Sequence, residues 1–98
     1  MGLLVEYSVA EGKAQEQIDA LQAFVSALKA LNDNGFSYTA FETDDPTRFI
    51  AVLEFDDEEA KQRFLQSDAF DTYREGTKGR FTAPPATTPI KFVASTRN

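Results

Sequence analysis

Residues 48–65 read RFIAVLEFDDEEAKQRFL and join a strand pattern directly to a helix pattern. The segment from Arg48 to Phe55 is mostly apolar and lacks glycine and proline, which is typical of a buried strand. Asp56 or Asp57 can cap the helix that follows, and two glutamates come next, where the positive end of a helix dipole favours acids. The stretch therefore predicts a strand followed at once by a helix.

The helical region after this cap carries an apolar stripe as far as residue 73. The stripe consists of Ala60, Phe64, Leu65, Phe70 and Tyr73. Ser67-Asp68 interrupts it with a second capping pattern, which predicts two short helices in series. Gly76 and Gly79 are expected to end the region.

Upstream of this stretch, residues 36–42 alternate like a strand, and the turn from Thr43 to Thr47 is rich in Asp and Pro. Two strands so close in sequence pair most easily as an antiparallel hairpin. Residues 14–32 repeat apolar side chains at steps of three and four, which predicts a helix that Asn34-Gly35 ends. The alternation from Leu3 to Val9 predicts the first strand.

Downstream, Thr82 to Pro89 is predicted to be a loop and Pro89 to Ser95 the last strand, with Ile90 and Phe92 on one side. The order strand, helix, strand, strand, helix, strand is that of a ferredoxin-like βαββαβ fold of the α+β class. We expect a four-stranded antiparallel sheet, and a single domain over residues 1–98.

Alternation along the strands divides the predicted sheet into two faces. The face expected to carry the helices consists of Leu3, Val5, Tyr7, Val9, Phe36, Tyr38, Phe49, Ala51, Leu53, Phe55, Ile90 and Phe92. The opposite face mixes Leu4, Phe41, Ile50, Val52 and Val93 with Glu6, Ser37, Thr39, Arg48, Glu54 and Lys91. So apolar a face is not expected to stay bare in a small monomer, which predicts that a partner sheet covers it.

The composition argues against several classes of function. Sixteen acidic and ten basic side chains give a net charge of −6, which disfavours binding to nucleic acid. Because Cys, His and a dinucleotide glycine fingerprint are absent from the sequence, we predict no cofactor, whether haem, flavin or metal. The longest apolar run, Phe49 to Leu53, is far shorter than the roughly 20 residues of a membrane span. We therefore expect no membrane insertion and a cytoplasmic location.

The stretch from Asp57 to Phe70, which follows a strand ending in Glu54-Phe55, resembles the second-helix signature of the antibiotic biosynthesis monooxygenase family. Three further segments are similar to that family in the same order: Val5-Glu6-Tyr7 to Gly12, Asn34-Gly35-Phe36, and Asp45-Pro46-Thr47-Arg48-Phe49. The resemblance covers nearly the whole chain and rests on the order and spacing of these segments.

This resemblance implies a dimeric α+β barrel, in which the mixed faces of two sheets meet and each protomer has a ligand cleft between its own sheet and helices. Members of the family include cofactor-free oxygenases of aromatic polyketides and haem-degrading oxygenases. The haem-degrading branch uses an Asn on the first strand and a Trp and a His on the second helical region. The matching positions here are Val5 or Glu6, Phe64 and Arg74, which argues against haem degradation.

The chain has three phenols, Tyr7, Tyr38 and Tyr73, which the strand and helix phases direct toward one cleft. A phenol inside an apolar cleft can donate a hydrogen bond to an anionic phenolate or enolate substrate. Alternatively, each ring packs in the core and its hydroxyl meets backbone or water. Phe64 is expected in the apolar wall, and Arg74 either reaches the cleft or pairs with an acid on the surface.

Two other clusters have structural explanations. The acidic run Asp56 to Glu59 suits a helix start and lacks the ladder of a calcium loop, so no metal site is predicted there. Gly76 to Arg80 has two cations that could cradle an anionic substrate group at the cleft rim. It lacks the spacing of a phosphate-binding loop, however, and favours a flexible turn at the end of a helix.

The sequence thus predicts a homodimer that binds a small aromatic or polyketide-like molecule, with a cofactor-independent monooxygenase as the leading hypothesis. Tyr7, Tyr38, Phe64, Tyr73 and Arg74 are the candidate binding residues, and no catalytic residue is predicted. The alternative is a non-enzymatic small-molecule-binding or assembly module of the same fold. A third hypothesis is an isomerase of small lactones.

Overall fold

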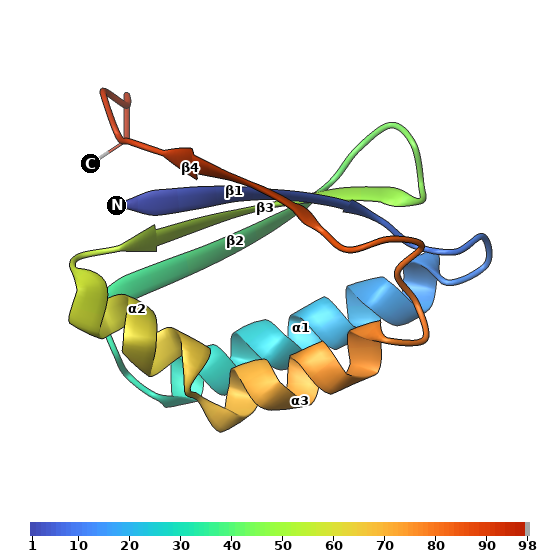
Figure 1. Ribbon diagram of the computed structural model, residues 1–98, viewed down its shortest axis with the longest axis horizontal. Coiled ribbons are helices and arrows are strands. Elements are labelled where there is room, and N and C mark those ends of the chain that lie inside the picture. The colour runs from blue at the N-terminus through green and yellow to red at the C-terminus, as the bar shows by residue number, and fades with distance from the viewer. Residues whose placement is uncertain (98) are drawn as a thin grey trace.

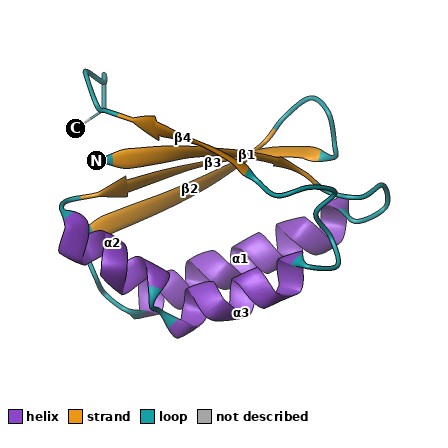
Figure 2. Cartoon of the chain, viewed as in Figure 1, coloured by secondary structure: helices purple, strands orange, loops and turns teal. Residues whose placement is uncertain are grey.

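The computed structural model describes residues 1–97 and has two layers, a sheet and a set of helices on one of its faces (Figure 1). Its elements in chain order are β1 (Gly2–Ser8), α1 (Ala14–Ala30), β2 (Phe36–Glu42), β3 (Arg48–Phe55), α2 (Glu58–Leu65), α3 (Asp68–Thr77) and β4 (Ala86–Ile90). The four strands are antiparallel in the order β2-β3-β1-β4. The predicted α+β, ferredoxin-like fold is confirmed, and Figure 2 shows the three helices lying against the sheet.

The strand register decides which side chains meet the helices. Leu53 of β3 lies opposite Leu3 of β1 and Tyr38 of β2, so these three side chains share the helix-facing side. Val52 lies opposite Leu4 and Thr39 on the other side, which no helix covers. We call this second side the open face.

The core between sheet and helices consists of two groups of buried side chains. One surrounds Phe64 and includes Phe24, Leu28, Ala51, Leu53, Phe55 and Ala60. The other contains Tyr7, Val9, Leu21 and Phe49. Aromatic rings dominate both groups, which suits a small chain because each ring buries a large apolar area.

The start of each short helix follows from a single capping side chain. Asp57 Oδ1 accepts a hydrogen bond from the Ala60 amide at 2.8 Å, and Ser67 Oγ accepts one from the Phe70 amide at 3.1 Å. Each bond satisfies an amide that has no partner within its helix. The predicted break at Ser67-Asp68 is therefore confirmed, and Asp57 is the cap of α2.

Replacing the α2 cap in Asp57→Ala is expected to lower the free energy of unfolding by about 1 kcal/mol. Asp56→Ala is the matched control, because this exposed neighbour removes the same charge without capping the helix. Urea denaturation of the two variants measures the difference. Equal losses for both would mean that charge, and not the cap, stabilises the start of α2.

The helix α1 ends earlier than the sequence predicts. It stops at Ala30, and the left-handed residue is Asn32, with φ of 52°, not Asn34-Gly35. The loop that follows is held by Asp33, which accepts from the Gly35 amide at 2.8 Å and from Arg63 Nε at 2.6 Å. The Arg63 guanidinium lowers the pKa of the Asp33 carboxyl below its usual value. This contact joins the loop to α2.

The last strand also differs from its prediction. The predicted last strand is present as β4, but its bounds are Ala86–Ile90 and not residues 89–95, so part of the predicted loop at 82–89 is strand. Pro89 fits there because β4 is an edge strand, where a missing amide hydrogen is tolerated. Ile90 pairs with Gly2 on the open face, not on the helix-facing side. Phe92 and Val93 lie beyond the strand, with exposed fractions of 69% and 89%.

Among residues 1–97, no helix is both long enough and apolar enough to cross a membrane. Asn98, the last residue of the predicted domain, lies outside the described residues.

Candidate functional site

A buried cluster of polar groups lies where β1, α1 and α3 meet, and Gln17 is its centre. Gln17 Nε2 donates to the hydroxyl oxygens of Tyr7 and Tyr73, each at 2.8 Å. Its Oε1 accepts from Arg80 Nε at 2.9 Å. All of the hydrogen-bonding capacity of the amide nitrogen is thus used by two phenols that are far apart in the sequence.

The third phenol, that of Tyr38, lies beside the same cluster. The Tyr73 hydroxyl is close enough to Tyr38 and to Tyr7 to raise the pKa of both. Burial is the larger cause and raises the pKa of these two phenols well above the usual value. Phenols are protonated at neutral pH in any case, and the raised pKa keeps Tyr7 and Tyr38 protonated, and therefore hydrogen-bond donors, further into alkaline pH.

The folding pattern explains why these residues converge. Strand alternation turns Tyr7 and Tyr38 toward the helices, and Gln17 lies on the buried stripe of α1 together with Leu21 and Phe24. The Tyr73 ring stacks on Phe24 with centroids 4.4 Å apart, which joins α3 to α1. We call Tyr7, Tyr38, Tyr73, Gln17 and Arg80 the phenol cluster.

Both the backbone and the side chain of Arg80 make hydrogen bonds that hold this residue in position. Its carbonyl oxygen accepts from the Ala10 amide at 2.7 Å, which fixes the segment after α3 against the end of β1. The residue has an exposed fraction of only 7%. Residues 78–80 form the predicted turn after α3, but the charged side chain of Arg80 is enclosed there.

The other two predicted site residues lie elsewhere. Phe64 has an exposed fraction of 1% and sits in the centre of the core, where its ring meets Phe36 and Phe55 edge-on. Arg74 is exposed, pairs with Asp71 at 3.3 Å and lies over the Phe70 ring. The structure thus brings the three tyrosines together and leaves Arg74 on the surface.

Sequence reasoning missed Gln17 entirely. Gln17 lies four residues before Leu21, where the apolar stripe of α1 would continue toward the N-terminus of the helix. A polar residue at such a position was the available signal. A buried amide at such a position needs several partners, and this need predicts polar neighbours on the elements packed against it.

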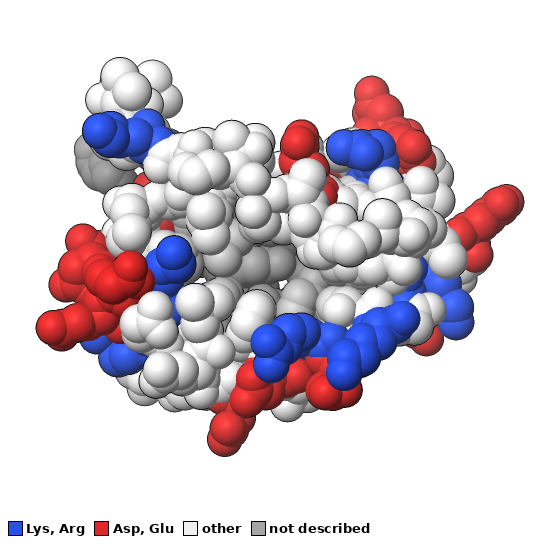
Figure 3. Space-filling model, in the orientation of Figure 1, with Lys and Arg blue, Asp and Glu red and all other residues white. Residues whose placement is uncertain are grey.

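Two of the hollows beside the helices lie near the predicted site residues or the β1–β4 edge. A pocket of about 350 Å³ lies under the β1–β4 edge beside α2, and Leu3, Phe55, Lys61 and Pro89 contribute to its lining. Figure 3 shows the near face of the molecule hollowed between β4 and the α2–α3 pair, with mainly uncharged side chains around the hollow. A second groove, of about 410 Å³, runs between α1 and α3 and reaches Tyr73 and Arg80.

The family of the chain follows from its match to the antibiotic biosynthesis monooxygenase model, which extends over residues 1–76. Because the match covers most of the chain, the protein belongs to the antibiotic biosynthesis monooxygenase family. A comparison with curated proteins finds no significant match.

Solved structures share the fold at low sequence identity. A Nitrosomonas europaea protein that carries the family's name superposes with a TM-score of 0.84 at 16% identity, covering 95% of this chain and 98% of that one. A Pseudomonas aeruginosa protein gives 0.80 at 19% identity, with coverages of 95% and 93%. A Mycobacterium tuberculosis protein gives 0.81 at 17%, with coverages of 97% and 96%. These TM-scores show a common fold, and at such low sequence identity the comparison shows the fold alone.

Proposed function

We propose that this protein binds a small aromatic or polyketide-like molecule with an ionisable hydroxyl group between its sheet and helices, and oxygenates it without a cofactor. The observation that carries the proposal is the phenol cluster. Burial raises the pKa of two of its phenols, and one end of the cluster is a buried cation. Family membership supports a monooxygenase-like or small-molecule-binding role.

The chemistry requires stabilisation of negative charge on a substrate oxygen. When an anthrone-type methylene loses a proton, the resulting enolate can react directly with dioxygen. One oxygen atom becomes the new carbonyl, and the other leaves as water with the two methylene hydrogens, so no external reductant is needed. Neutral phenol donors in a low-dielectric interior stabilise such an enolate more strongly than water does.

Tyr38 and Tyr73 are the two phenols that are only partly buried. They differ in their hydrogen-bond partners, which gives the proposal a direct test. Tyr73 accepts from Gln17, so Tyr73→Phe leaves a buried amide hydrogen unpaired and is expected to lower stability by about 1 kcal/mol. The Tyr38 hydroxyl adjoins Tyr73 and not the Gln17 amide, so Tyr38→Phe is expected to change stability less. Both variants are expected to lower oxygen consumption with anthrone and quinol substrates by about a hundredfold.

Ser26→Ala serves as the control, because it removes an exposed hydroxyl from α1 that belongs to neither the phenol cluster nor the groove lining. Oxygen uptake at wild-type rate in both tyrosine variants, with reduced stability only, would show that the phenols serve the core. No uptake by the wild-type protein with any substrate of the set would refute the oxygenase proposal.

We further propose that two copies pair through their open faces. Leu4, Ile50 and Val52 are only partly buried there, and Phe41 on β2 has an exposed fraction of 50%. A small domain rarely leaves such an apolar patch in water, and a second copy of the same sheet would cover it symmetrically.

Sedimentation equilibrium at micromolar protein is expected to give about twice the chain mass of 10.9 kDa. Val52→Lys places a charge in the centre of the open face and is expected to yield monomers. Gln22→Lys, on the exposed side of α1, introduces the same charge and is expected to leave the dimer intact. A monomeric wild-type protein would contradict this assembly.

One observation favours the second candidate function, a binding or assembly module without catalysis. Phe24, Phe36, Phe55 and Phe64 pack together and fill the space between β2–β3 and the helices. If the wild-type protein binds 2-naphthol in calorimetry but consumes no oxygen with any substrate of the set, the result would support the binding module and refute the oxygenase.

A further inference from the structure

Arg80 is a buried cation without an anionic partner among residues 1–97. Its Nε donates to the neutral Gln17 amide, while Nη2 is enclosed and has no hydrogen-bond partner. None of the ion pairs in the described residues includes Arg80. Enclosing a guanidinium is costly unless an anion and hydrogen-bond acceptors compensate its lost hydration. The arrangement therefore suits an anion supplied from outside.

The groove between α1 and α3 gives such an anion a place beside the guanidinium. Arg80 lines the groove, and so does Gly76. A Cβ atom on Gly76 would lie 3.0 Å from Arg80 Nη1 and 3.3 Å from Nη2, so the two nitrogens lie directly beside this glycine. Because residue 76 has no side chain, the Arg80 guanidinium can occupy the space beside it.

The rest of the groove is lined mostly by apolar side chains. Its lining includes Ala20, Ala23 and Ala27 of α1, Ala69 of α3, and the rings of Phe24 and Tyr73. Small side chains and ring surfaces suit a flat apolar body. Asp68, also in the lining, is exposed and disfavours a second negative charge on the ligand.

We propose that the groove between α1 and α3 binds a small aromatic monocarboxylic acid, whose carboxylate pairs with the Arg80 guanidinium and whose ring lies against the alanines of α1. The groove shares Tyr73 and Arg80 with the phenol cluster, but binding of a carboxylate there does not depend on any oxygenation. Hydrogen bonds from a guanidinium to a carboxylate are charge-assisted and stronger than those between neutral groups, and Arg80 Nη1 has no partner among the described hydrogen bonds.

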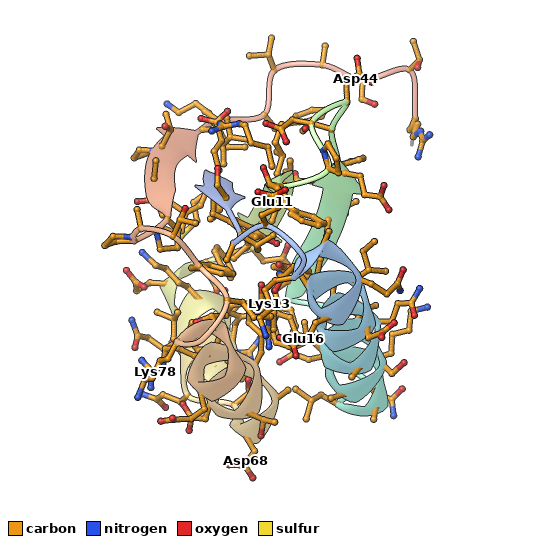
Figure 4. All side chains as sticks on the ribbon, turned by 90° about the vertical axis from the view of Figure 1, so that its right-hand side faces the viewer. Glu11, Lys13, Glu16, Asp44, Asp68 and Lys78 are labelled. Atoms are coloured by element: carbon orange, nitrogen blue, oxygen red, sulfur yellow. The ribbon has the colours of Figure 1, made fainter. Side chains whose placement is uncertain are left out.

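Calorimetric titration with 2-naphthoate and with its neutral counterpart 2-naphthamide tests the proposal at neutral pH. The wild-type protein is expected to bind naphthoate about tenfold more tightly than naphthamide. Arg80→Gln is expected to remove this preference. Lys78→Gln is the matched charge control, because Lys78 is exposed, pairs with Glu75 and points away from α1 (Figure 4). It is expected to change naphthoate affinity by less than about twofold.

A second variant keeps the test decisive if Arg80→Gln does not fold. Ala23→Leu enlarges an exposed side chain within the groove, so it is expected to weaken naphthoate binding about tenfold without lowering the thermal midpoint. Wild-type affinity in Ala23→Leu, equal binding of naphthoate and naphthamide, or no binding of naphthoate at millimolar concentration would each overturn the proposal. Oxygen uptake with the anthrone and quinol substrates separates this proposal from the proposed function. Uptake without naphthoate binding would refute the groove alone, whereas naphthoate binding that depends on Arg80, without uptake, would refute the oxygenase alone.

Discussion

Phe64→Ala is expected to lower the free energy of unfolding by about 3–5 kcal/mol, a large part of the stability of a chain this small. Phe64 has an exposed fraction of 1% and contacts rings from α1, β2, β3 and α3. Deleting its ring leaves a cavity that these rigid neighbours can only partly fill. Urea denaturation followed by circular dichroism measures the loss.

The adjacent residue provides the control for this variant. Leu65 follows Phe64 on α2 and has an exposed fraction of 37%, so Leu65→Ala is expected to cost less than about 1 kcal/mol. A similarly small loss for Phe64→Ala would mean that the ring borders an open cleft, as the sequence suggested, and not the core.

Gln17→Met is expected to lower the free energy of unfolding by about 3 kcal/mol, although methionine nearly preserves the side-chain volume. Gln17 has an exposed fraction of 0%, and the change removes hydrogen bonds to Tyr7, Tyr73 and Arg80 together. Arg80 Nε would then be buried without an acceptor, and an unpaired charged donor is the most costly kind. Thermal denaturation is expected to show a drop of more than about 10 °C.

Gln22→Met, five positions later on the exposed side of α1, makes the same chemical change in water and is expected to leave the midpoint nearly unaltered. If Gln17→Met and Gln22→Met had the same thermal midpoint, the Gln17 hydrogen bonds would contribute nothing to holding α1, α3 and β1 in place.

The fold could be predicted where pattern and local chemistry agree. The alternation in residues 48–55, the capping side chains of Asp57 and Ser67, and the short turn before Arg48 each depend on near neighbours in sequence. β4 could not be placed because its position depends on pairing with β1, at least eighty residues away, and Pro89 pointed to a loop. A proline is tolerated there only because β4 lies at the edge, which the local sequence does not reveal.

The candidate site was predictable to the extent that it follows strand and helix phase. Phase alone directs Tyr7 and Tyr38 toward the helices and Tyr73 back toward the sheet. Gln17 and Arg80 are sixty-three residues apart, and their contact depends on how the segment after α3 returns to the end of β1. Nothing in the residues around Arg80 distinguishes an enclosed guanidinium from the solvated one that a glycine-bounded turn suggests.

The gathering of all three tyrosines in the phenol cluster also gives the protein a built-in optical reporter. The chain has three tyrosines and no tryptophan, so its ultraviolet emission originates at a single interior location. Hydrogen bonding and ring stacking both alter phenol emission, and any molecule that enters beside Arg80 or displaces the Gln17 amide changes them. Occupancy of the interior can therefore be followed in unlabelled wild-type protein, at concentrations too low for calorimetry.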